Sequence, residues 1–186
     1  MKLIITEKPS VAKSIASALG VTSRADGYFE GGGWLISWCI GHLVGLADAA
    51  AYDDRYKKWR YEDLPILPDP FRYVVSEEKA AQFHILRSLM ERSDVTELVN
   101  ACDAGREGEL IFRYIYSYLE CRTPFVRLWI SSLTDRAIRE GLQHLRPGNE
   151  YDNLYLSAKA RSEADWIVGI NASQALAVAA GRGVWS

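Results

Sequence analysis

The chain lacks the features that mark exported, membrane-spanning and zinc-binding proteins. Its 186 residues include only three cysteines, Cys39, Cys102 and Cys121, which are widely spaced and form no C-x-x-C pair. Neither a disulfide framework nor a zinc site is therefore expected. No apolar run reaches the roughly 18 residues of a membrane helix, and the first residues lack the apolar core of a signal peptide. These absences predict a soluble protein that is not exported and whose thiols are reduced and mostly buried.

An excess of positive charge is also missing. Lysine and arginine number 22 against 24 aspartates and glutamates, which gives a net charge of −2, whereas isolated nucleic-acid-binding domains are usually strongly basic. A nucleic-acid enzyme is not excluded, because a metal site uses acidic residues and a larger protein can carry the phosphate contacts elsewhere. Two local basic groups, at residues 55–60 and 136–146, are interpreted mainly as solvated surface.

A phosphate-binding glycine loop is absent as well. Gly31, Gly32 and Gly33 are consecutive, but they lack the Lys-Ser or Lys-Thr ending and the following helix of a nucleoside-triphosphate loop. Residues 28–40 instead predict a β-hairpin that turns at these glycines. A nucleotide-binding α/β domain is accordingly disfavoured.

The chain does contain an acidic loop between a strand and a helix, in TELVNACDAGREGE at residues 96–109. The apolar residues before Asp103 predict a strand, and Asp103 then stands where the backbone leaves the sheet. Ligands of open parallel α/β sheets bind at this carboxyl edge. Gly105 is expected to allow a tight turn. Glu107 follows at the start of the next helix, so two carboxylates can converge.

A second pattern of strand, acidic loop and helix begins the chain, in KLIITEKPS at residues 2–10. Its acidic residue, Glu7, also follows the strand directly. If the two strands are neighbours in the sheet, Glu7, Asp103 and Glu107 share one pocket. Carboxylate oxygens brought together in this way suit Mg²⁺, which takes one or two carboxylates and completes its shell with water and substrate phosphate.

The helix patterns carry recognisable end signals. We expect Ser10 to cap a helix that Gly20 ends. In the helix that starts at Glu107, Glu109 and Arg113 are four residues apart and are expected to pair on its outside.

The whole pattern predicts strand–helix units repeated around a parallel sheet, which is an α/β fold. Residues 52–71 are punctuated by prolines and predict an ordered loop. Further strands are expected at residues 72–76 and 125–130. Further helices are expected at residues 79–92 and from Ser132 or Thr134 to Leu145. From Tyr151 the pattern is one long helix, so we place a domain boundary near Asn149.

Six stretches resemble, in order, the amino-terminal part of the bacterial topoisomerase III group of type IA DNA topoisomerases. They are EKPSVAKSIASALG, GHLVGLADAAAYDDRYKKW, LPILPDPF, ACDAGREGELIFR, RLWISSLTDRAI and ARSEADWIVGINAS. The strand-end glutamate and the D-A-G-R-E loop resemble the Toprim domain, which topoisomerases share with bacterial primases and some nucleases. The resemblance covers nearly the whole chain. It implies a Toprim (Rossmann-like) parallel sheet flanked by helices at residues 1–149. Residues 150–186 would begin a truncated helical domain that binds single-stranded DNA.

The resemblance also implies an activity. Type IA topoisomerases cut one DNA strand through a 5′-phosphotyrosine, pass another strand and reseal the first, with Mg²⁺ as cofactor. The implied partners are single-stranded or negatively supercoiled DNA and the remaining domains of the same polypeptide, in a monomeric protein of the bacterial cytoplasm and nucleoid. None of the ten tyrosines matches the nucleophile, so this chain alone is expected to be inactive.

Catalytic roles carry over from the resemblance to four residues. Glu7 matches the general acid and base that protonates the leaving 3′ oxygen. Glu7, Asp103 and Glu107 match metal-binding positions. Lys8 matches a lysine that contacts the scissile phosphate.

DNA-binding positions are implied as well, and several keep a structural alternative. Arg106 either offsets the charge of the pocket or contacts phosphate. Trp166 either stacks on a base, worth about 1–3 kcal/mol, or fills the core, and a local salt bridge alone explains Arg161 and Asp165. Gln174 stands where relatives often carry arginine, which weakens the expectation of a phosphate contact. The matched positions are Lys8, Trp59, Arg106, Arg161, Asp165, Trp166 and Gln174.

One departure from the family pattern concerns the metal. Many relatives have a second aspartate where this chain has Gly105, so we expect one well-held Mg²⁺ rather than two. Two other functions remain open at this point: another Toprim enzyme, such as a primase or nuclease, and a non-catalytic module that binds metal or nucleic acid.

Overall fold

Residues 1–181 are described by a computed structural model. The end of the predicted helical segment, 182–186, lies outside the described residues. Between residues 1 and 181, none of the helices combines the length and the apolar character that crossing a membrane requires. The described chain forms two compact units. The first contains residues 1–44 and 75–158, and the second contains residues 45–74 and those from 159 onward.

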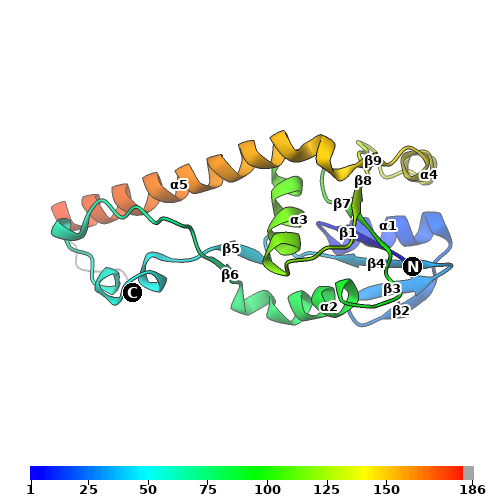
Figure 1. The fold of residues 1–186 in the computed structure, drawn as a ribbon, viewed down its shortest axis with the longest axis horizontal. Helices are drawn as coiled ribbons and strands as arrows, with labels where there is room; N and C mark the ends of the chain where they lie inside the picture. The colour runs from blue at the N-terminus through cyan, green and yellow to red at the C-terminus, as the bar shows by residue number, and fades with distance from the viewer. Residues whose placement is uncertain (182–186) are drawn as a thin grey trace. The chain divides into compact units, whose positions relative to one another are not determined.

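The first unit is built around a seven-stranded sheet with the order β2-β3-β4-β1-β7-β8-β9 (Figure 1). The four central strands, β4, β1, β7 and β8, are parallel, which confirms the predicted α/β fold. Antiparallel strands extend both borders. The bounds are β1 Lys2–Thr6, β2 Ser23–Ala25, β3 Tyr28–Gly31, β4 Trp34–Trp38, β7 Glu97–Ala101, β8 Phe125–Arg127 and β9 Arg146–Pro147.

Strand β1 lies between β4 and β7, so the two predicted strand–loop–helix patterns are neighbours. Thr6 at its carboxyl end is aligned with Trp38 of β4 and with Ala101 of β7. Leu3, Ile4 and Ile5 are fully or almost fully buried, as expected for a strand covered on both faces. The predicted hairpin is also confirmed, since β3 and β4 pair through a turn at Gly32 and Gly33.

Helices cover the sheet on both sides (Figure 1). Helix α1 (Pro9–Leu19) and helix α4 (Asp135–Gln143) share a core with the sheet, in which Ile15, Ile138 and Ile4 are fully buried. On the other side, helix α2 (Ala80–Met90) and helix α3 (Arg106–Tyr118) meet through Phe83 and Tyr118, whose ring centroids are 5.6 Å apart.

The end signals of these helices were predicted with mixed success. Gly20 ends α1 in the left-handed conformation, with φ 69°, and Thr134 caps α4 by accepting a hydrogen bond from the Ala137 amide. The expectation for Ser10 was wrong. Pro9 begins α1 two residues earlier than a Ser10 cap would place it, so Lys8 is the N-cap and Ser10 lies inside the first turn. Proline is favoured at this first position because its missing N–H has no partner there anyway.

The second unit combines the proline-rich segment with the later part of helix α5 (Asp152–Ala179). Strands β5 (Val44–Leu46) and β6 (Tyr73–Val75) form a two-stranded sheet. Between them lie short 3-10 helices at Ala49–Ala51, Asp54–Lys57 and Tyr61–Asp63. The Asn171 side chain holds this segment to α5, because it accepts from the Ile66 amide at 2.6 Å and donates to the Ile66 carbonyl at 2.9 Å. The domain boundary near Asn149 stays a prediction.

The loop from β7 into α3 is tightly packed at Gly108 and open at Gly105. A β-carbon at Gly108 would lie 2.1 Å from the Asp103 carbonyl oxygen. Gly105 has an extended backbone with φ 166° and ψ −179°, and a β-carbon there would have no heavy atom of the described residues within 4 Å. The expectation that Gly105 supplies a tight turn was therefore wrong. Gly108 is the glycine that the loop requires, because α3 packs directly on the Asp103 backbone.

Replacing Gly108 with alanine should lower the free energy of unfolding by about 1–3 kcal/mol, because the added methyl group forces the Asp103 loop and α3 apart. Urea unfolding measures this change. Gly105→Ala is the matched control, and it should leave the stability unchanged or slightly higher, because its backbone suits alanine. Equal losses in the two variants would contradict the packing described here.

Candidate functional site

Two acidic residues and a lysine meet at the carboxyl edge of β1 and β7. Glu7 and Lys8 directly follow β1, and Asp103 lies two residues after the end of β7. The Lys8 ammonium donates to Asp103 Oδ2 at 2.9 Å and lies 3.6 Å from Glu7 Oε1. The predicted convergence of the two loops is thus present, with Lys8 between the carboxylates. Both acids face one positive charge.

The environments of these three side chains differ. Glu7 is largely buried, with 13% of its side chain exposed, whereas the Lys8 and Asp103 side chains are about half exposed. The Glu7 Oε2 atom is buried and has no hydrogen-bond partner among residues 1–181. A buried carboxylate oxygen without a partner is costly, so this atom fits a further cation or donor brought in by a ligand.

Lys8 is strongly held in its charged form. Its hydrogen bond to Asp103, together with the negative charge of Glu7, raises the pKa of the Lys8 ammonium above its usual value. A permanently positive side chain between two acids removes much of their mutual repulsion. The same charge is suited to contact a phosphate oxygen.

Glu107 is held by a different partner. Its Oε1 atom contacts Nε2 of His42, which lies in the loop after β4. Among residues 1–181, no three histidine, cysteine, aspartate or glutamate side chains are arranged as a ready metal cluster. The structure therefore brings Glu7 and Asp103 together through Lys8 and pairs Glu107 with His42. The three-carboxylate metal site stays a prediction.

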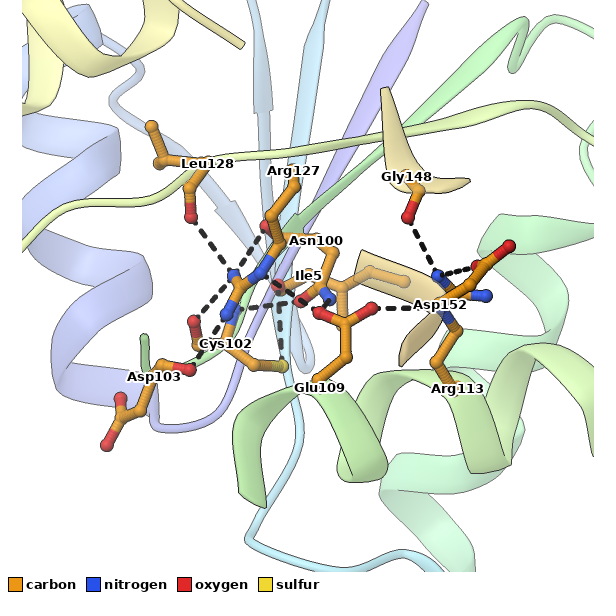
Figure 2. A network of polar contacts seen from close by, with 10 residues as sticks. All are labelled: Ile5, Asn100, Cys102, Asp103, Glu109, Arg113, Arg127, Leu128, Gly148 and Asp152. Carbon is orange, nitrogen blue, oxygen red and sulfur yellow. Dashed lines mark hydrogen bonds and ion pairs between the residues drawn. The ribbon is translucent and has the colours of Figure 1, made fainter. Parts of the chain in front are cut away.

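A buried ionic network lies next to the Asp103 backbone (Figure 2). Glu109 and Arg127 are both fully buried, and Arg127 Nε lies 3.1 Å from Glu109 Oε2. Arg113 Nε donates to Glu109 Oε1 at 2.9 Å. The predicted pair of Glu109 and Arg113 is present, but its placement on the outside of α3 was wrong. The spacing i, i+4 puts the two residues on one face of the helix without saying whether that face is exposed.

Burial shifts both members of the central pair. It raises the pKa of the Glu109 carboxyl, although Arg127 and Arg113 oppose the rise. It lowers the pKa of the Arg127 guanidinium, although Glu109 opposes the fall. Each charge therefore depends on the other, because an unpaired charge in this position would be strongly unfavourable.

The predicted DNA-binding residues outside this centre are dispersed. Arg106 is exposed at the first position of α3. Trp59 is half-buried, and three of the four basic residues near it form ion pairs: Arg55 with Asp53, Lys57 with Asp54 and Arg60 with Asp63. The interpretation of this basic group as solvated surface agrees with these pairs.

The predicted residues of α5 take part in packing within the second unit. Arg161 and Asp165 form the expected i, i+4 pair at 3.5 Å, and both side chains are exposed. Trp166 donates from its indole nitrogen to the Ala47 carbonyl at 3.0 Å and lies edge-on against Phe71. Gln174 is buried. Contacts of these residues and of Trp59 with DNA stay predictions.

A hollow of about 340 Å³ opens beside Asp103 in the first unit. It is lined by α1, by the end of β7 and by the loop after β8, through Val11, Ala101, Cys102, Asp103, Ala104, Ile130, Ser131, Ser132 and Leu133. Part of a substrate can therefore lie next to the acidic centre. All three cysteines are free, as expected, and Cys39 and Cys102 are buried.

Two residues of the centre were not assigned from the sequence. His42 could not be assigned, because a lone histidine in a sequence carries no positional signal. Arg127 was missed altogether. Its signal is an arginine at the end of a short buried strand, a place where an unpaired charge is not tolerated.

Comparison with known proteins identifies the family. Residues 2–133 match the Toprim domain, and the chain belongs to the Toprim family. It is 50% identical over 174 residues to DNA topoisomerase 3 of Bacillus cereus and 51% identical over 174 residues to DNA topoisomerase 3 of Bacillus subtilis. Each match covers 94% of this chain but 24% of the relative, so the chain spans about a quarter of the length of these proteins.

The fold has a solved counterpart. Full-length topoisomerase I from Thermotoga maritima matches with a TM-score of 0.58 and 22% sequence identity, over 89% of this chain and 24% of that one. At this identity the match supports the architecture, a mixed sheet flanked by helices and followed by a helical segment.

Glu109→Gln should lower the free energy of unfolding by about 3–5 kcal/mol, because it leaves the buried Arg127 charge without its counterion. Urea unfolding measures the loss. Glu91→Gln is the matched control: Glu91 forms an Arg–Glu pair of the same i, i+4 spacing and nearly the same length, 2.8 Å, but exposed. It should leave the unfolding midpoint almost unchanged. A similar response of the two variants would contradict the role of burial.

Proposed function

We propose that this chain is the Toprim half of the active site of a type IA DNA topoisomerase of the topoisomerase III group. In this role it supports Mg²⁺-dependent cleavage of one DNA strand, passage of another strand and religation. The attacking tyrosine comes from a part of the protein outside this chain. The observation that carries the proposal is the meeting of Glu7, Lys8 and Asp103 at the carboxyl edge of two adjacent parallel strands.

The side chains at this edge suit such a reaction. Asp103 and Glu7, with Glu107 nearby in sequence, are the groups that would hold Mg²⁺, and the unpartnered Glu7 Oε2 supports this assignment. A bound Mg²⁺ would neutralise phosphate charge as the transition state develops. Lys8 steadies the scissile phosphate. Glu7 gives a proton to the leaving 3′ oxygen and takes it back on religation.

The partners follow from this role. The substrate is single-stranded or negatively supercoiled DNA, and the residues that we assign to its binding are Lys8, Trp59, Arg106, Arg161, Asp165, Trp166 and Gln174. The remaining domains of the same polypeptide complete the site, and the protein acts as a monomer in the bacterial nucleoid. The names of the relatives and the Toprim match support the DNA substrate and the metal.

In a protein extended to the length of its relatives, Glu7→Gln and Asp103→Asn should each reduce Mg²⁺-dependent relaxation of negatively supercoiled DNA at least a hundredfold. Both changes remove a charge while keeping the shape, and loss of one acid–base or electrostatic group typically costs 10²–10⁴ in rate. Gel assays of supercoiled plasmid measure the rate, with Glu91→Gln as the control.

Full activity of both variants would contradict the site assignment. Nicking without religation would favour a Toprim nuclease, and primer synthesis would favour a primase. Tight, Mg²⁺-independent binding of single-stranded DNA by the unextended chain, without any activity of the extended protein, would favour a non-catalytic binding module.

A calorimetric titration should show a single tight Mg²⁺ site, because Gly105 leaves the loop one carboxylate short of the family pattern. Gly105→Asp fits the open, extended position and should raise the affinity roughly tenfold, or about 1.4 kcal/mol. Gly105→Asn adds the same bulk without charge and should not. Two tight sites in the unchanged protein would refute the single-metal proposal.

A further inference from the structure

Arg127 holds the backbone that carries Asp103. Its guanidinium is fully buried and donates four hydrogen bonds to main-chain carbonyls (Figure 2). Nη1 donates to the carbonyls of Asn100 at 2.9 Å, Cys102 at 2.8 Å and Leu128 at 3.0 Å, and Nη2 donates to the carbonyl of Asp103 at 2.8 Å.

These bonds replace a missing strand partner. The pairing between β7 and β8 extends to the bond from the Leu128 amide to the Asn100 carbonyl, at 2.9 Å. Beyond it, β7 ends at Ala101, and the carbonyls of Cys102 and Asp103 lie outside the paired strand. The Cys102 carbonyl is buried and needs a partner, which Arg127 supplies, and Arg127 also donates to the partly buried carbonyl of Asp103. The planar, multidentate guanidinium is suited to this task, whereas a lysine ammonium is not.

The carboxylate of Glu109 keeps this guanidinium in place. Its Oε2 atom faces Arg127 Nε at 3.1 Å and also accepts from Asn100 Nδ2 at 3.0 Å. Asn100 Oδ1 in turn accepts from the Cys102 amide at 3.1 Å. Stability alone does not account for a buried ion pair, because apolar residues of similar volume are often equally stabilising. They would, however, leave the two loop carbonyls without donors.

The carbonyls of Cys102 and Asp103 both point toward Arg127. The Asp103 side chain points to the opposite side (Figure 2), where it accepts a hydrogen bond from Lys8. We infer that Arg127, held by Glu109, is a positioning residue that fixes the direction of the Asp103 carboxylate toward the shared cation site. This inference rests on the proposed function, because it gives that carboxylate the task of binding a metal.

The test separates positioning from stability with the double variant Arg127→Met/Glu109→Gln. This variant removes both buried charges and the guanidinium, while the glutamine carbonyl oxygen can still accept from Arg113 Nε, as Glu109 Oε1 does. It should regain most of the stability that Glu109→Gln alone loses. A second variant, Arg127→Lys, keeps a cation for Glu109 but lacks the planar donor set. Phe112→Leu is a control of packing loss in the same helix, at a buried residue whose ring packs on Tyr116 and Phe125.

Two quantities are measured on the 186-residue chain: the dissociation constant of Mn²⁺, and the NMR order parameters of the Asp103 and Ala104 amides. In the double variant and in Arg127→Lys, Mn²⁺ should bind at least tenfold more weakly. The order parameters should fall from the rigid range of about 0.85 toward the flexible range below about 0.6. Phe112→Leu should change neither quantity. If the double variant does not fold, Arg127→Lys decides alone.

Mn²⁺ affinity retained within about twofold of the unchanged chain would overturn the inference, whatever the order parameters show. If the unchanged chain binds no Mn²⁺, the proposed metal site fails, and the order parameters alone decide the role of Arg127. Mobility gained at residues 103 and 104 would then uphold positioning of Asp103, and unchanged order would overturn it.

Discussion

The pairing of β1 with β7 is the constraint on which the rest of this structure depends. The two strands are about a hundred residues apart in the chain, yet they run parallel in adjacent positions and end together. Each is followed by a turn into a helix, so the side chains just past the two ends share one edge of the sheet. Slipping the register or exchanging the neighbour of β1 would separate Glu7 from Asp103.

Two carboxylates close together repel each other, and the structure contains one feature that offsets this repulsion and another that holds the loop of Asp103. On the solvent side, the Lys8 ammonium lies between the acids, and their negative charge raises its pKa further above the usual value. On the interior side, Arg127 and Glu109 form a buried pair, and Arg127 donates its hydrogen bonds to the loop backbone rather than to the Glu7 and Asp103 carboxylates. Lys8 reduces the repulsion between the two carboxylates, and the Arg127–Glu109 pair fixes the direction of the Asp103 side chain. The half-exposed side chains of Lys8 and Asp103 are therefore accessible to a substrate on a loop whose backbone is hydrogen-bonded to Arg127.

Much of this arrangement could be predicted from the sequence, because the central strands and helices have strong local signals. The apolar runs before Glu7 and Asp103, the glycine turn of the hairpin and the stop at Gly20 all depend on neighbouring residues. The features that were predicted wrongly depend on residues that are distant in the chain. The spacing of Glu109 and Arg113 shows that they are neighbours, but only packing against Arg127 decides that they are buried. The sequence does not distinguish the roles of Gly105 and Gly108, yet only Gly108 lies against the backbone of Asp103. The union of residues 45–74 with the later part of α5 has no local signal either, since it depends on single contacts such as that of Asn171 with Ile66.

The central claim is that Glu7 and Asp103, with Lys8 between them, flank one cation site, and adding Mn²⁺ to the isotopically labelled chain tests it most directly. Paramagnetic broadening reports which amides lie near the bound ion. The account predicts that the amides of residues 7–8 and 103–104 broaden together, at the same low Mn²⁺ concentration, before any other acidic region responds. Broadening confined to one of the two loops, or appearing first elsewhere on the chain, would contradict it.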